Sequence, residues 1–132
     1  MTTAIPASHL DLLEGPVVVT LVTLMPDGQP QATPVWCDLA EGFIRVNTVR
    51  GRQKDRNLAE RPKVTVLAID PKDPYRWLEV RGEVVDSTEE GGAEHINALS
   101  HLYKGKDFRT LEPDEVRVIY RIRPVRVNAN SH

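Results

Sequence analysis

The sequence predicts a mainly β protein, an antiparallel β-barrel that carries short helices. Three observations support this prediction: short runs rich in β-branched residues recur through the 132 residues, turn signals separate most of them, and few segments suit a helix. About six strands joined mostly by hairpins are typical of such a barrel. The length predicts one domain over residues 1–132, because a domain usually has roughly 100–200 residues.

The first predicted elements are a helix and a strand. Residues 8–15 are expected to form a short helix, which Ser8 caps and Gly15 ends. Residues 17–24 follow as a strand. This run is β-branched and apolar on both faces, so we expect it to be buried.

Two turns separate the next strands. Pro26-Asp27-Gly28 is a strong hairpin signal, because proline presets one backbone dihedral angle and glycine accepts a positive φ. The strand after it, residues 31–39, contains Pro34, which implies a sheet edge or a bulge. A turn at Glu41-Gly42 leads to a third strand over residues 43–48.

The middle of the chain interrupts the strands with a helix. Residues 52–61 lose the alternation of a strand and suit a helix, which Pro62 ends. Strands are predicted over residues 63–70 and 77–85, the second with a regular alternation of apolar and charged side chains.

The last predicted elements are a helix and a strand. The helix starts at Ser87 or Thr88, ends at Gly105 and carries an apolar stripe at helical spacing. Residues 115–123 alternate again as a strand, which Pro124 is expected to break before a further short strand.

Composition excludes several classes of protein. With 17 Lys and Arg against 19 Asp and Glu, the net charge of -2 disfavours a dedicated nucleic-acid or membrane-surface protein. No apolar run approaches the roughly 18 residues that span a membrane, and no signal-peptide pattern opens the chain. We therefore expect a cytoplasmic protein.

Few side chains are candidates for chemistry of their own. The single cysteine, Cys37, cannot form an internal disulfide and is expected to be an inert strand residue. His95 and His101 are about 240° apart around a helix and cannot bind one metal from one face, so surface or capping roles are expected. No serine lies in a Gly-x-Ser-x-Gly context, so a hydrolase triad has no support.

Positive charge is concentrated in residues 45–63, which carry seven Lys or Arg against two Asp or Glu. Arg50, Arg52 and Lys54 fall where a strand turns into a helix. A helix N-terminus offers unpaired N–H groups and the positive end of the helix dipole, so this arrangement can bind a phosphate. A solvated basic helix is the alternative interpretation. Nucleic-acid binding is a weaker one, because few aromatic residues interleave with the charges.

The order of several motifs resembles that of a known family. The most specific is Gly-Arg-Gln-Lys-Asp-Arg-Asn-Leu at residues 51–58, followed by a proline and a strand; the others lie at residues 17–24, 27–31, 33–36, 46–48 and 78–82. This order resembles the flavin-binding split β-barrel family, the pyridoxamine-phosphate-oxidase-like superfamily. It is most similar to the branch of oxidoreductases that use the deazaflavin coenzyme F420.

The resemblance implies an antiparallel split β-barrel of the FMN-binding type that forms a homodimer, with two equivalent cofactor sites at the subunit interface. It also assigns the cofactor-binding residues. The phosphate of the cofactor would be held by Asn47, Thr48, Arg52 and Lys54, and their loop would be supported by Asn57. The ring of the cofactor would be lined by Gln31, Ala32, Thr33 and Pro34. The pocket would be completed by Tyr75, Arg76 and Trp77 of the partner subunit.

The implied activity is hydride transfer from reduced F420 to an electron-poor small molecule such as an enone, an imine or a quinone. FMN is the alternative cofactor, and a non-catalytic carrier of flavin or F420 is the alternative function. Oxidation of vitamin B6 is not expected, because the C-terminal residues 121–128 lack the longer tail of true pyridoxamine-phosphate oxidases. The sequence identifies no catalytic residue, which suits a protein whose cofactor supplies the chemistry.

Overall fold

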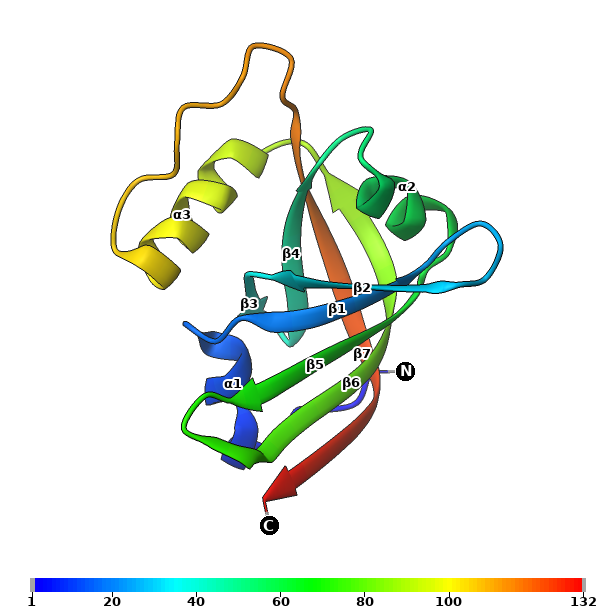
Figure 1. The fold of residues 1–132 in the computed structure, drawn as a ribbon, viewed down its shortest axis with the longest axis vertical. Coiled ribbons are helices and arrows are strands. Elements are labelled where there is room, and N and C mark those ends of the chain that lie inside the picture. The colour runs from blue at the N-terminus through cyan, green and yellow to red at the C-terminus, as the bar shows by residue number, and fades with distance from the viewer. Residues whose placement is uncertain (1, 132) are drawn as a thin grey trace.

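A computed structural model describes residues 2–131, and over these residues the chain forms one seven-stranded antiparallel sheet in the order β2-β1-β5-β6-β7-β4-β3 (Figure 1). The strands are β1 (Val19–Leu24), β2 (Pro30–Val35), β3 (Cys37–Ala40), β4 (Phe43–Val49), β5 (Lys63–Asp70), β6 (Asp73–Thr88) and β7 (Arg117–Ser131). The prediction of a mainly β, antiparallel fold is therefore confirmed.

The two edges of this sheet meet at Trp36. Strands β2 and β3 lie at opposite edges in the strand order, yet only Trp36 separates them along the chain. The sheet must therefore curl into a partly open barrel. The predicted single strand over residues 31–39 is divided at this corner, and Pro34 lies on an edge strand, as its missing N–H requires.

Strands β6 and β7 are longer than predicted. They pair with each other from Arg76 opposite Ser131 to Thr88 opposite Ile119. This backbone pairing extends both strands beyond the segments in which apolar and polar residues alternate. Pro124 does not break β7. It lies opposite Gly82, beside a shift in register. The missing N–H of proline is tolerated at such a bulge, because the regular strand pairing is interrupted there.

The helices begin at other residues than predicted. A 3₁₀ turn (Ala7–His9) precedes α1 (Asp11–Glu14), and the Ser8 hydroxyl contacts the His9 ring instead of capping a helix. Helix α2 (Gln53–Glu60) matches its prediction closely. Helix α3 (Gly92–Lys104) starts after Gly91, because residues 87 and 88 belong to β6 and pair with β7. It ends at Gly105 as predicted.

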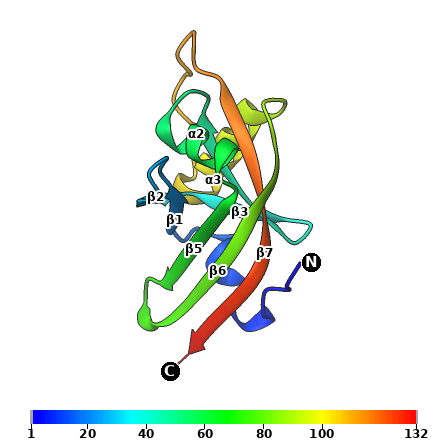
Figure 2. The same cartoon turned by 90° about the vertical axis from the view of Figure 1, so that its right-hand side faces the viewer.

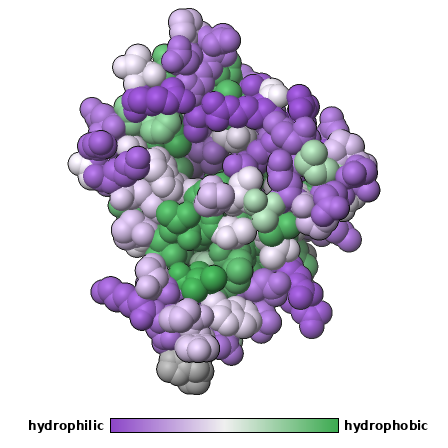
Figure 3. Space-filling view, in the orientation of Figure 1, coloured by the Kyte–Doolittle hydropathy of each residue, from purple (hydrophilic) through white to green (hydrophobic). Residues whose placement is uncertain are grey.

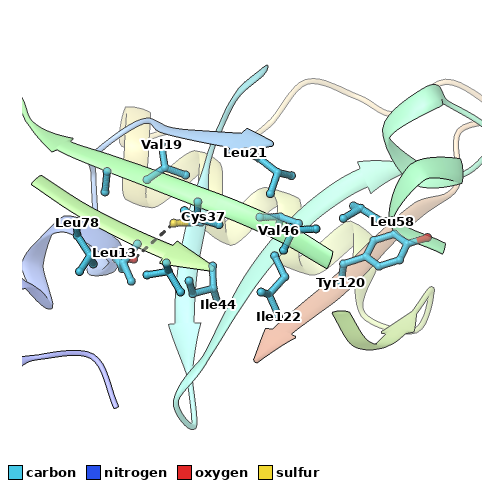
Figure 4. Close-up of a cluster of buried hydrophobic side chains, with 14 of the residues drawn as sticks. Leu13, Val19, Leu21, Cys37, Ile44, Val46, Leu58, Leu78, Tyr120 and Ile122 are labelled. Carbon is cyan, nitrogen blue, oxygen red and sulfur yellow. Dashed lines mark hydrogen bonds between the residues drawn. The ribbon is translucent and has the colours of Figure 1, made fainter. Parts of the chain in front are cut away.

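The core lies inside the curl of the sheet (Figure 4). Leu13, Leu21, Ile44 and Leu78 are fully buried there, and each such side chain stabilises the fold by roughly 1.5–3 kcal/mol. Cys37 lies among them, with its sulfur 3.8 Å from the carbonyl oxygen of Leu13. Burial raises the pKa of its thiol to about 12, which agrees with the expectation of an inert strand residue.

The helices lie at different ends of the barrel. Figures 1 and 2 show α2 and α3 at one end and α1 at the other, near the hairpin that joins β5 to β6. Helix α2 packs on β1 and β4, and α3 packs on β4 and β7. Among the described residues, no helix has the length and apolar character needed to cross a membrane.

Candidate functional site

A buried carboxylate fixes the loop between β4 and α2. Asp55 accepts hydrogen bonds from the Gly51 N–H at 2.8 Å, from the Tyr120 hydroxyl at 2.5 Å and from Arg50 at 2.9 Å. Burial alone would raise the pKa of this carboxyl, but the hydrogen bonds and the charge of Arg50 hold its pKa below the usual range. The first turn of α2 is thus held in place from inside the protein.

A cavity of about 390 Å³ opens beside this first turn, between α2, α3 and the strands β2 and β4. One wall is apolar and includes Val35, Trp36, Ile96, Leu99 and Phe108. Trp36 stacks on Tyr103 at 5.3 Å between ring centroids and meets Phe108 edge-on at 6.3 Å. Trp36 and Phe108 thus form an aromatic side of the cavity.

Five of the predicted site residues line this cavity although they come from three separate segments. Helix α2 and its N-cap contribute Arg52 and Lys54, β4 contributes Asn47 and Thr48, and β2 contributes Pro34. The structure therefore brings together the residues expected to hold a phosphate.

Arg52 and Lys54 have no hydrogen-bond or ion-pair partner for their charged groups within residues 2–131. Most other cations of residues 45–63 are engaged: Arg45 pairs with Asp38, Arg50 with Asp55 and Glu89, Arg61 with Glu60, and Arg56 donates to Gln53. Lys63 lies on β5, outside the cavity. Of the positive charges in residues 45–63, those of Arg52 and Lys54 are thus the ones that line the cavity without a partner. This favours an anionic ligand over the alternative of a solvated basic helix.

Lys54 is half-buried, and its surroundings disfavour its charge. Burial lowers the pKa of its ammonium group, and the neighbouring charges of Arg52 and Arg117 lower the pKa further. A bound anion would relieve this repulsion.

Arg117 was missed by the sequence reasoning. It is the first residue of β7, and its side chain is 7% exposed and lines the same cavity. In an alternating strand it looks like an ordinary outward-facing charge, so only the tertiary structure reveals it.

The residues expected around the ring lie on the edge strand next to the cavity. Within the described residues β2 pairs only with β1, so the backbone groups along its outer side have no strand partner. Gln31 and Thr33 are half-buried, whereas Ala32 and Pro34 are exposed on the alternate positions. A cofactor ring at these four residues would therefore face the outer backbone edge of β2. The side chains do not form one continuous surface for it.

Asn57 lies outside the cavity lining and connects α2 to neighbouring strands. It is fully buried, and its amide nitrogen donates to Thr23 at 3.0 Å, with a longer contact of 3.4 Å to Gln31. Its carbonyl oxygen accepts from Gln53 at 2.7 Å and from Arg61 at 3.0 Å. Asn57 therefore ties α2 to the strands that flank the cavity.

Tyr75, Arg76 and Trp77 lie on β6 beside the hairpin from β5, at the opposite end of the barrel from α2 (Figure 1). Arg76 is held there by ion pairs with Asp11 and Asp70. Within one subunit these three residues are not part of the cavity.

His95 does not have the surface or capping role that was expected. Its side chain is 3% exposed and lies between Asp38, 3.1 Å away, and Asn47, 3.1 Å away. His101 is on the surface, 2.6 Å from Asp107. Across residues 2–131, no three His, Cys, Asp or Glu side chains are grouped so that they could hold a metal ion.

The curled antiparallel sheet, closed at Trp36 and flanked by α2 and α3, is a split β-barrel. The sequence profile of the pyridoxamine 5'-phosphate oxidase family matches residues 5–131. The chain belongs to this family of flavin-binding oxidoreductases.

Several solved structures are similar to the chain. A protein described as an F420 reductase is 34% identical, with a TM-score of 0.85 over 94% of this chain and 98% of that one. A conserved hypothetical protein from Mycobacterium tuberculosis is 27% identical, with a TM-score of 0.77 over 99% and 87%. A putative pyridoxamine 5'-phosphate oxidase from Listeria innocua, 19% identical with a TM-score of 0.68 over 89% and 91%, shares the fold. No curated protein sequence matches significantly.

Proposed function

We propose that the protein is an oxidoreductase that transfers a hydride from reduced coenzyme F420 to an electron-poor small molecule. The observation that carries this proposal is the pair of unpartnered cations, Arg52 and Lys54, at the N-terminus of α2 in a cavity with an aromatic wall. The 34% identity to an F420 reductase over nearly the whole chain supports the choice of cofactor.

The phosphate-binding part of the site would be formed by the first turn of α2. Arg52 and Lys54 would supply charge-assisted hydrogen bonds, and the free N–H groups of the helix N-terminus would add dipolar attraction. Asp55 keeps this turn in place by binding the Gly51 N–H and Tyr120. Asn47 and Thr48 on β4 line the cavity beside these groups.

The ring-binding part would be formed by the outer edge of β2. The backbone N–H groups on the outer edge of β2, together with the Thr33 hydroxyl, can donate hydrogen bonds to a heteroaromatic ring and stabilise charge that develops on it. When bound, the cofactor supplies the hydride, and the protein orients it and excludes water.

We further propose a homodimer in which Tyr75, Arg76 and Trp77 reach the cavity of the partner subunit. The outward face of the sheet supports this proposal. Val22, Leu67, Ile69 and Trp77 line an open hollow there, and Figure 3 shows a hydrophobic patch across the middle of the molecule. A second copy would cover the outward side chains of strands that are apolar on both faces.

The test is a titration of the purified protein with F420, followed by the fluorescence of the cofactor. We expect saturable binding at micromolar concentrations, and then oxidation of reduced F420 when enones, imines or quinones are added. No spectral change at these concentrations would overturn the choice of cofactor.

FMN is the second candidate, because the family is a flavin-binding one. A yellow preparation with a flavin absorbance band would favour FMN. Tight binding of either cofactor without turnover on the substrate panel would instead support a carrier function. The same preparation thus separates the three possibilities.

A further inference from the structure

We propose that Arg117 is a third anion-binding residue of the cavity, and that Asn47 and His95 are positioning residues that hold Arg117 in place. This inference rests on the proposed function only in naming the anion as the phosphate of the cofactor. The arrangement itself would bind any phosphate-bearing ligand of suitable size.

The guanidinium group of Arg117 is fixed in orientation but not saturated. Its Nε donates to Oδ1 of Asn47 at 2.8 Å, and its Nη1 donates to Oε2 of Glu115 at 2.9 Å. The group also lies 5.3 Å from the centroid of the Phe108 ring. An arginine has five N–H donors, so most of its donors remain for a ligand in the cavity that it lines.

The charge of Arg117 is only partly compensated. Glu115 is shared with Arg109, which binds both of its carboxylate oxygens at 2.7 and 3.0 Å. Burial, Arg52 and Arg109 all lower the pKa of Arg117, against the opposing effect of Glu115. Arg117 therefore joins Arg52 and Lys54 in a cavity that lacks negative charge among its described lining residues.

The donor and acceptor groups of the Asn47 side chain are all engaged within the protein. Its amide nitrogen donates to the Gly92 carbonyl at 2.9 Å and to Nδ1 of His95 at 3.1 Å, and its carbonyl oxygen accepts from Arg117. The acceptor at Gly92 and the donor at Arg117 together determine which way the amide points. With both N–H groups occupied, the side chain of Asn47 acts on an anion through Arg117 and not by direct donation.

His95 completes the support. Because Nδ1 accepts from Asn47, the proton of the neutral ring is on Nε2, which donates to Asp38 at 3.1 Å. Asp38 is itself held by two hydrogen bonds from Arg45 at 2.7 and 2.8 Å. A continuous series of side chains therefore runs from Arg45 at the surface through the protein to Arg117 at the cavity.

The test measures binding of inorganic pyrophosphate and of F420 by calorimetry to the full chain and four variants. Arg117→Gln should weaken both ligands by roughly tenfold or more, because a charge-assisted contact is lost. Arg109→Gln is the matched control: Arg109 shares Glu115 but does not line the cavity, so binding should change by less than about twofold. Equal effects of the two variants would overturn the inference.

A double-mutant cycle tests the positioning role. Asn47→Ala should weaken binding in the wild-type background but have little further effect when Arg117 is already Gln. A merely structural role for Asn47 would give additive losses in the two backgrounds, and would contradict the assignment.

Nitrogen-detected NMR of the Arg117 Nε–H in the wild-type chain keeps the inference testable if a variant does not fold. Added pyrophosphate should shift this resonance, and an unchanged resonance at saturation would refute direct binding. If F420 and FMN fail to bind while pyrophosphate binding depends on Arg117, the proposed function fails and this inference stands. If F420 binds equally well to Arg117→Gln, the inference fails and the proposed function stands.

Discussion

Arg52 and Lys54 differ from the other cations near them in what surrounds them. The sequence shows seven cations in residues 45–63, but four of them are engaged by acidic or amide groups. Arg45 pairs with Asp38 on the neighbouring strand, and Arg50 pairs with Glu89 from a distant segment. At the scale of single residues, the candidate site is therefore defined by the two cations that line the cavity without a partner, since Lys63 lies outside it.

Replacing either cation should weaken cofactor binding without unfolding the protein. Lys54→Ala and Arg52→Ala should each cost roughly 1.5–3 kcal/mol of binding free energy, because each removes a charge-assisted contact. Fluorescence titration with F420 measures the loss. Lys63→Ala is a suitable control because Lys63 lies outside the cavity, and unchanged affinity in both site variants would mean that the phosphate binds elsewhere.

Glu115 should make stability depend on pH in the acidic range. Hydrogen bonds from Arg109 chiefly, and also from the Glu112 N–H and Arg117, outweigh burial and lower the pKa of Glu115 to about 2 from the ordinary 4.5. Its folded pKa is depressed, so its contribution is present above pH 4.5 and is lost as the pH falls toward 2.

Urea unfolding at about pH 6 and about pH 3 measures this effect. Glu115→Gln should be less stable than wild type at the higher pH and lose less stability on acidification. The exposed Glu90→Gln should behave as wild type at both. A Glu115→Gln variant with the full acid sensitivity of the wild type would show that Glu115 does not contribute.

At the scale of elements, the bulge between β6 and β7 explains why these strands continue where the sequence indicated a stop. Gly82 lies opposite Pro124, and its backbone approaches β7 closely. A Cβ added at Gly82 would lie 2.7 Å from the carbonyl oxygen of Arg123 and 2.7 Å from a methyl group of Ile122. The close approach therefore needs glycine at this position.

Gly82→Ala should destabilise the protein by roughly 1–3 kcal/mol, since the new methyl group overlaps backbone that cannot move without breaking strand pairs. Urea or thermal unfolding measures the change. Val85→Ala, at an exposed position of the same strand, should change the free energy of unfolding by about 0.5 kcal/mol or less. Similar stabilities for the two variants would contradict the close packing at Gly82.

At the scale of the whole molecule, the outward face of the sheet carries apolar side chains that one subunit leaves partly exposed. Strand β1 alternates buried Val19 and Leu21 with outward Val22 and Leu24, and β5 has Leu67 on the same outward face. A strand that is apolar on both faces is stable when both faces are covered. This pattern is the physical basis of the proposed homodimer.

Leu67→Glu should convert the proposed dimer to a monomer, because it places a charge in the middle of the apolar face. Light scattering coupled to size exclusion measures the mass. Ala98→Glu, an exposed position of α3, adds the same charge away from that face and should leave the dimer intact. A wild-type protein with the 14.8 kDa mass of one chain would refute the dimer.

The sequence by itself determined the antiparallel strands, the turn at Gly28, the edge position of Pro34, the helix end at Gly105 and the basic segment around Arg52. All of these depend on local dihedral preferences, periodicity or local charge, which a single sequence displays.

Only the tertiary structure decided the rest. The continuation of β7 through Pro124 depends on pairing with β6, and the buried positions of His95 and Arg117 depend on partners far away in the chain. The same holds for which cations remain free at the cavity. These features arise from contacts between distant segments, which periodicity and local preference do not encode.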